Sequence, residues 1–106
     1  MKAQTIAAAL CVSALALAGA KATPDKNDVT IKNFSFGPNA ITVAAGSTVT
    51  WRNSDGEPHT VVSADGLFRS AALDTDESFS FKFTKAGTFK YVCTIHPRMV
   101  ATVTVK

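Results

Sequence analysis

The strongest constraint on the fold is the strict alternation of apolar and polar residues in the stretch SFSFKF, residues 78–83. Its phenylalanines fall on one side of an extended chain, and its serines and lysine fall on the other. A period of two indicates a β-strand with one face against a core, because successive side chains of a strand point to opposite faces. We therefore interpret Phe79, Phe81 and Phe83 as core residues.

The same alternation recurs along most of the chain, and no segment has a convincing helical period. The pattern predicts an all-β domain, an antiparallel β-sandwich or small barrel of about seven to eight short strands. The predicted inward-facing rows are Val29 and Ile31; Ile41 and Val43; Val49 and Trp51; Phe89, Tyr91 and Cys93; and Met99, Ala101, Val103 and Val105.

Glycines mark the predicted turns between these strands. They follow alanine or aspartate at Ala45-Gly46, Asp55-Gly56, Asp65-Gly66 and Ala86-Gly87, pairs that are typical of turns and loops. A change of parity before Phe34 predicts a bulge or break near Asn33.

The N-terminus has the pattern of a secretory signal peptide at residues 1–20. Lys2 gives a positive start, an apolar run follows, and small residues up to Ala20 form a cleavage site. Cleavage after Ala22 is an alternative, and so is a retained membrane anchor, although the run is short for a membrane span. We expect a mature domain at residues 21–106 in the bacterial periplasm, with an extracellular location as the alternative, and no stable membrane insertion after signal removal.

The mature chain has ten Lys and Arg residues against eight Asp and Glu residues, without long runs of either sign. This mildly basic, solvated surface gives weak support to an acidic partner or a membrane surface and no case for nucleic-acid binding. We interpret the acidic stretch from Asp74 to Glu77 as a solvated turn. We expect a monomer.

A single cysteine remains once the signal peptide, which contains Cys11, is discounted. A lone thiol in an oxidising compartment is a liability, and Cys93 can be protected either by burial or by coordination to a metal. Cys93 ends one predicted strand and Met99 opens the next, so His96 lies on the loop between them. A second loop could bring His59 to the same end of the sandwich.

Two imidazoles, one thiolate and one thioether favour copper over other metals. A His₂Cys set with a weak axial methionine is the signature of a blue-copper electron-transfer site. Structural zinc prefers four firm ligands, and calcium and magnesium prefer oxygen. Taken singly, each of these residues is more often structural; their joint occurrence at matching strand ends favours a metal site formed by His59, Cys93, His96 and Met99.

Nearly the whole mature chain resembles the cupredoxins, in particular the short plastocyanin- and amicyanin-like proteins. The resemblance is carried by ITVAAGSTVTWRNSD, PHTVVSADGLF, FSFKFTKAGTFKYVCTIHP and MVATVTVK. It implies a Greek-key β-sandwich and one type 1 copper ion ligated by His59, Cys93 and His96, with Met99 axial. It also implies a one-electron carrier whose redox partners dock transiently near His96.

Four positions depart from the usual pattern of such proteins. Ile95 stands where proline is frequent, which would regain a backbone donor near the cysteine sulfur. Thr60 replaces an asparagine that helps to join the two ligand loops, so the rigidity of the site depends on its hydroxyl. Arg98 replaces an apolar residue beside His96, either as a solvated charge or as a partner-selecting one, and Ala101 stands where glycine is frequent.

Three other functions are alternatives to electron transfer. A copper-handling module that transfers no electrons uses the same ligands, so the sequence leaves it open. We do not expect an enzyme, because copper enzymes need further histidines and the mature chain has only His59 and His96. A Cys-His hydrolase would also need an orienting group and an oxyanion hole, and neither is apparent. A purely structural sandwich would not need all four ligands.

Overall fold

The computed structural model describes residues 27–106. The predicted signal peptide and both predicted cleavage sites lie outside the described residues. Residues 27–106 contain no helix that is long and apolar enough to cross a membrane. The strands are β2 (Asp28–Lys32), β3 (Ser35–Gly37), β4 (Ala40–Val43), β5 (Ser47–Asn53), β6 (Val62–Ser63), β7 (Ser78–Phe83), β8 (Gly87–Val92) and β9 (Val100–Val105).

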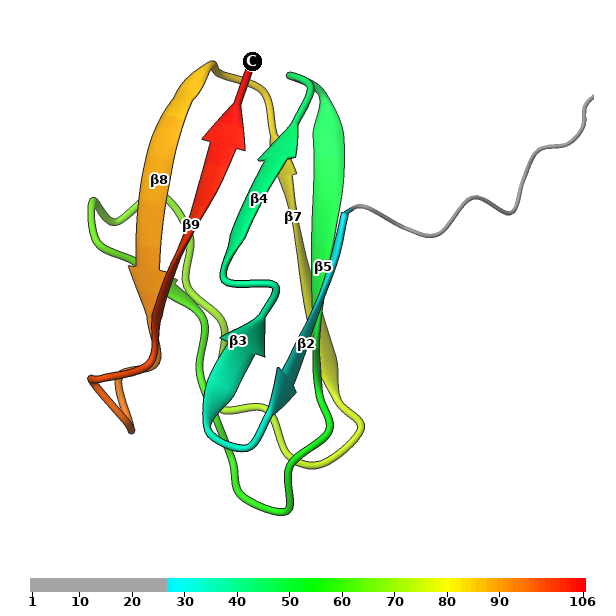
Figure 1. Cartoon of the computed structure of the whole chain (residues 1–106), viewed down its shortest axis with the longest axis vertical. Coiled ribbons are helices and arrows are strands. Elements are labelled where there is room, and N and C mark those ends of the chain that lie inside the picture. The colour runs from blue at the N-terminus through cyan, green and yellow to red at the C-terminus, as the bar shows by residue number, and fades with distance from the viewer. Residues whose placement is uncertain (1–26) are drawn as a thin grey trace, which may run out of the picture.

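The strands form the two four-stranded sheets of a β-sandwich, which confirms the predicted fold class (Figure 1). One sheet has the order β3-β2-β5-β7, and the other has the order β4-β9-β8-β6. The expectation of purely antiparallel pairing is wrong, because β2 pairs with β5, and β4 with β9, in parallel. The chain changes sheets between β3 and β4, so β4 enters the second sheet in the same direction as β9.

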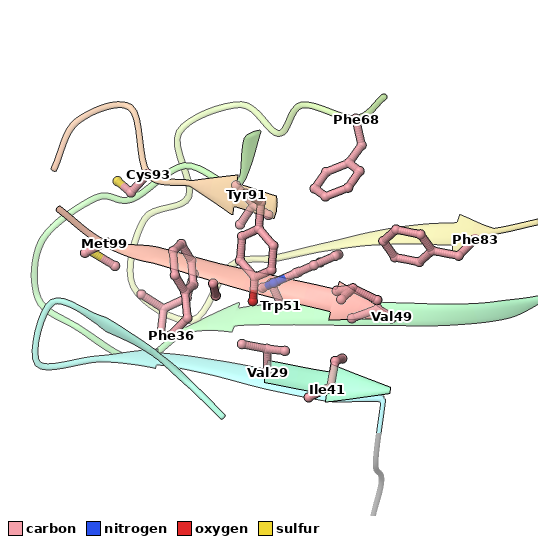
Figure 2. Close-up of a cluster of buried hydrophobic side chains, with 14 of the residues drawn as sticks. Val29, Phe36, Ile41, Val49, Trp51, Phe68, Phe83, Tyr91, Cys93 and Met99 are labelled. Carbon is pink, nitrogen blue, oxygen red and sulfur yellow. The ribbon is translucent and has the colours of Figure 1, made fainter. Parts of the chain in front are cut away.

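The predicted inward rows form the core. Trp51 and Tyr91 are fully buried between the sheets, and Phe83 packs near them (Figure 2). Phe79 and Phe81 share the inward face of Phe83 but are only partly buried, because β7 is the edge strand of its sheet. The phenylalanine stripe is therefore a core stripe that becomes buried toward one end of the strand.

The predicted break near Asn33 is a tight hairpin turn between β2 and β3. Lys32 and Ser35 are paired across it, and both turn residues, Asn33 and Phe34, have positive φ, at 53° and 57°. This combination matches the twist of a two-residue hairpin. It leaves Phe34 half exposed, while Phe36 on the next strand is buried.

Three connections gather at one end of the sandwich, opposite the C-terminus (Figure 1). They are the β2–β3 turn, the segment between β5 and β6, and the loop between β8 and β9. The Asp55 carboxylate accepts hydrogen bonds from the N–H groups of the β2–β3 turn, and the Thr60 N–H donates to the Cys93 sulfur. These bonds hold the three connections together. All four predicted metal ligands lie on or beside these connections.

Candidate metal centre

Cys93 directly follows β8 and continues its inward row, so its side chain is fully buried. Two backbone hydrogen bonds close the loop that follows. The Met99 N–H donates to the His96 carbonyl oxygen at 2.9 Å, and the Cys93 N–H donates to the Met99 carbonyl oxygen at 3.1 Å. The chain therefore curls as the three-residue spacing requires, and His96 turns back toward the sulfur.

His59 approaches from the segment between β5 and β6. It forms an isolated antiparallel bridge with Leu73: the His59 N–H donates to the Leu73 carbonyl at 3.1 Å, and the Leu73 N–H donates to the His59 carbonyl at 2.7 Å. This bridge fixes the backbone, and the imidazole is fully buried. His59 thus reaches the site from a segment far from Cys93 in the sequence.

The three strong donors converge on one point. The Nδ1 atoms of His59 and His96 each lie 3.8 Å from the Cys93 Sγ, and the three ligand atoms all lie within 4.8 Å of one another. A metal ion bound at about 2.0–2.3 Å from nitrogen and sulfur donors needs separations of this size. The geometry therefore fits one ion between the two imidazoles and the thiolate.

Met99 lies at the same end of the core. Figure 2 shows the Cys93 and Met99 side chains together at the end of the sandwich, away from Val49 and Phe83. Met99 is buried and is the last residue before β9. The structure thus brings the fourth predicted residue beside the three strong donors, and this donor set is that of a type 1 copper site.

The cysteine sulfur has a hydrogen-bonding environment that favours the thiolate. Burial raises the pKa of Cys93, but the hydrogen bond from the Thr60 N–H, the adjacent imidazoles of His59 and His96 and the His96 N–H outweigh burial and lower it to about 6. The Thr60 N–H lies 3.4 Å from the sulfur. The thiolate is the form that binds metals, so the lowered pKa favours the form of Cys93 that can ligate an ion.

Thr60 performs the loop-joining role that the sequence left in question. Its hydroxyl oxygen accepts a hydrogen bond from the Thr94 N–H at 2.8 Å and lies 2.7 Å from the Thr94 hydroxyl. The backbone groups that hydrogen-bond to the sulfur are those of Thr60 and His96, rather than that of Ile95. Ala101 is buried and pairs with Tyr91 in the β8–β9 ladder.

Asp55 is a site residue for which the sequence pattern predicts only a turn. Its Oδ2 lies 2.8 Å from the His59 Nε2, and its carboxylate also accepts the N–H groups of Asn33 and Phe34. Burial raises the pKa of Asp55, but the hydrogen bonds from Phe34, Asn33 and His59 together hold it below its ordinary value. The signal available in the sequence was a carboxylate four residues before a candidate ligand histidine.

His96 differs from His59 because it reaches the surface. It is partly exposed and borders a hollow of about 420 Å³. The exposed rim includes Phe34 and Ile95, which are 50% and 45% exposed. The residues that line the hollow are Phe34, Ile95, His96, Pro97, Arg98 and Met99. One ligand edge is therefore accessible from outside, in mainly apolar surroundings.

The family model described as a cupredoxin-like domain matches residues 4–105 of this chain. The chain belongs to the cupredoxin family. Amicyanin-alpha of Methylorubrum extorquens is 34% identical over 119 aligned positions that cover all of both chains. Plastocyanin of Scenedesmus fuscus is 37% identical over 74% of this chain and all of that protein.

Solved cupredoxin structures have the same fold as this cupredoxin domain. A reduced tryptophan-to-tyrosine mutant of amicyanin superposes with a TM-score of 0.71 at 31% identity, over 74% of this chain and 80% of that chain. A purple cupredoxin from Nitrosopumilus maritimus gives a TM-score of 0.69 at 32% identity, over 74% of this chain and 98% of that chain. The predicted cupredoxin β-sandwich is confirmed.

Proposed function

We propose that this protein is a small periplasmic electron carrier that transfers one electron at a time through a single type 1 copper ion. His59, Cys93 and His96 would hold the ion, and Met99 would be a weaker fourth ligand. The observation that carries the proposal is the convergence of the two Nδ1 atoms on the Cys93 sulfur, at 3.8 Å each. Membership of a family that includes the blue copper proteins amicyanin and plastocyanin supports it.

Bound copper supplies a one-electron couple, Cu(II)/Cu(I). The protein's contribution is to hold the donors still, because a fixed set of ligands needs little rearrangement when the charge changes. His59 is fixed by its backbone bridge and its contact with Asp55. Cys93 is fixed by backbone and sulfur hydrogen bonds, and the buried core behind both residues excludes water.

We infer that electrons enter and leave through the exposed side of His96. The hollow beside it is mainly apolar, and such surroundings suit brief docking with a small contact area. Redox proteins are the proposed partners, and the carrier would work as a monomer. The predicted signal peptide supports export to the periplasm, and nothing in the charge distribution suggests nucleic acid as a partner.

The decisive experiment is a visible-absorption titration of the purified mature protein with Cu(II), followed by reduction and reoxidation. We expect an intense blue band that saturates at one copper per chain, bleaches on reduction and returns on reoxidation. Cys93→Ser should abolish the band. Ala101→Ser, which places a hydroxyl at another buried position, should leave it in place. Colourless binding would contradict the type 1 site.

A second measurement separates the carrier from a copper-handling module, which uses the same ligands. A carrier should give reversible electrochemistry and retain copper in the presence of a chelator in both oxidation states. Copper that passes readily to the chelator, without a reversible couple, would instead favour handling.

A further inference from the structure

We propose that Asp55 is a positioning residue that joins the ligand His59 to the β2–β3 turn and thereby holds Phe34 against the two ligand imidazoles. The proposal rests on the proposed copper site. It assigns to one carboxylate both the orientation of a ligand and the shielding of the centre. The contacts of Asp55, the conformation of the turn and the packing of Phe34 carry it.

The Asp55 carboxylate has three donors within hydrogen-bond distance. Its Oδ1 accepts the Asn33 N–H at 2.7 Å, and its Oδ2 accepts the Phe34 N–H at 2.9 Å. The same Oδ2 lies 2.8 Å from the His59 Nε2. The side chain is only 11% exposed, so water competes weakly for these oxygens.

The backbone of Asp55 is held as firmly as its side chain. Its N–H donates to the Asn53 Oδ1 at 2.9 Å, and its carbonyl oxygen accepts the Thr75 hydroxyl at 2.6 Å. The Asn53 side-chain amide in turn donates to the carbonyl oxygens of Glu57 and Leu73, at 2.8 Å each. Asp55 is therefore a fixed point from which the carboxylate can orient other groups.

The contact with Asp55 settles which nitrogen of His59 is free for a metal. An ionised carboxylate only accepts hydrogen bonds, so Nε2 must carry the proton. In the neutral imidazole Nδ1 then has the lone pair, and Nδ1 is the atom 3.8 Å from the Cys93 sulfur. Carboxylates that bond to the second nitrogen of a ligand histidine fix its orientation and increase its basicity.

The same carboxylate stabilises an uncommon backbone conformation. Both Asn33 and Phe34 have positive φ, a region that bulky residues such as phenylalanine rarely adopt. The two N–H groups that Asp55 accepts belong to these two residues. The turn is thus held by Asp55 of the His59 segment, which lies 22 residues from Asn33 and 21 residues from Phe34 in the sequence.

The conformation of this turn determines where the Phe34 ring lies. The ring packs edge-on against the imidazole of His96, with centroids 4.9 Å apart and planes at 77°, and against that of His59, at 5.4 Å and 82°. The two imidazoles lie 4.9 Å from each other. Phe34, itself half exposed, therefore shields His59 and part of His96, while the outer edge of His96 stays accessible.

Replacing Asp55 should change two measurable quantities, the midpoint potential and the rate of copper removal. A fixed negative charge hydrogen-bonded to a ligand favours Cu(II), so Asp55→Asn should raise the midpoint potential. We expect the preference for Cu(II) to fall about tenfold, which corresponds to about 59 mV for one electron. Loss of the turn's anchor should also expose the centre, so a chelator should remove copper from Asp55→Asn at least several-fold faster.

Two variants separate these effects. Phe34→Ala removes the covering ring but leaves the carboxylate, so it should speed copper removal while moving the potential little. Asp65→Asn is the matched control, because Asp65 also precedes a glycine in a turn and accepts a backbone N–H, from Leu67 at 3.0 Å. It removes the same charge away from the site and should change neither quantity.

A nuclear magnetic resonance measurement tests the link directly. The sample is the wild-type protein, loaded with Cu(I) if it binds copper. It should show a slowly exchanging proton on the His59 Nε2, and this proton should exchange faster in Asp55→Asn. An unprotonated Nε2 in the wild type would overturn the proposal. A blue Asp55→Asn protein whose potential and copper loss match those of Asp65→Asn would also overturn it.

These outcomes are distinguishable from a failure of the copper function. That failure would appear in the wild type as the absence of a blue band, and the proton on the His59 Nε2 would still report whether Asp55 orients the ring. If Asp55→Asn does not fold, the wild-type proton signal still tests whether Asp55 orients His59, and Phe34→Ala still tests whether Phe34 shields the centre. Unchanged copper loss from Phe34→Ala would overturn the shielding role.

Discussion

The hydroxyl oxygen of Thr60 accepts a hydrogen bond from the Thr94 N–H at 2.8 Å, and the two threonine hydroxyls lie 2.7 Å apart. Each threonine directly follows a proposed ligand, His59 or Cys93. A hydroxyl has one proton and two acceptor sites, so Thr60 can accept both groups of Thr94 and donate to the Cys93 sulfur, 3.8 Å away. The Thr60 hydroxyl oxygen therefore joins the two ligand segments, alongside the bond from the Thr60 N–H to the Cys93 sulfur.

Thr60→Val tests this link, because it keeps the branched shape and removes the hydroxyl. We expect the free energy of unfolding of the metal-free protein to fall by about 1 kcal/mol, the value of a typical hydrogen bond. Copper should also pass to a chelator faster. Urea unfolding and a chelator assay measure the two effects. Thr42→Val, at an exposed position of β4, is the control, and an equal response of both variants would contradict the role of Thr60.

Substitutions of Met99 should move the midpoint potential in opposite directions. Met99→Gln places a stronger donor at the axial position and favours Cu(II), so the potential should fall. Met99→Leu keeps a similar volume without a donor, so it should rise. Each tenfold change in the preference for Cu(II) is about 59 mV, and we expect shifts of at least this order. Voltammetry of the two blue variants measures both shifts. Equal midpoint potentials in Met99→Gln and Met99→Leu would exclude Met99 as a ligand.

Tyr91 provides a pH-dependent test of the core. It is the only tyrosine in the sequence, and burial, opposed only in part by Trp51, raises its pKa to about 12. Figure 2 shows its hydroxyl pointing toward the Trp51 indole nitrogen. The ultraviolet absorbance of the phenolate should therefore show a midpoint close to 12 in the native protein, compared with about 10 in urea.

The same shift predicts how stability depends on pH. Between these two values the unfolded chain loses the Tyr91 proton first, so stability should fall by about 1.4 kcal/mol for each pH unit. Below pH 10 the residue should contribute no slope. Native circular dichroism together with a phenolate midpoint near 10 would contradict this account of the core.

The strand positions and core faces followed from the sequence, because a period of two records directly which side chains point inward. Val29 and Ile31 on β2, and Val103 and Val105 on β9, are buried as predicted. The direction of pairing did not follow, since half-buried strands show the same alternation in parallel and antiparallel neighbours. The parallel pairs depend on where the chain changes sheets, near Pro38, and no local pattern reports that crossing.

Some residues of the site could be predicted from the sequence and one could not. His59, Cys93, His96 and Met99 could be proposed because their residue types already limit the metal. Asp55 could not, because an Asp-Gly pair predicts a turn whatever its carboxylate contacts. Its contacts join segments separated by more than 20 residues, and only the folded arrangement of the loops reveals them.

Arg98 is the only permanently charged residue among the described residues that line the hollow beside His96. If electrons pass through His96, its charge should select among small redox reagents. Arg98→Glu should slow oxidation of the Cu(I) protein by anionic hexacyanoferrate(III), and it should speed oxidation by a cationic cobalt(III) phenanthroline complex. We expect changes of about tenfold at low ionic strength, shrinking as salt screens the charges.

The control for Arg98→Glu is Lys85→Glu, which makes the same change of charge at the opposite end of the sandwich, between β7 and β8 (Figure 1). Stopped-flow rates with both oxidants, at two salt concentrations, give the comparison, and voltammetry checks that the midpoint potential is unchanged. A net-charge effect would alter the two variants equally, because overall attraction does not depend on which end carries the charge. Equal rates would therefore place the electron-transfer surface away from His96, whereas a response confined to Arg98→Glu would locate it there.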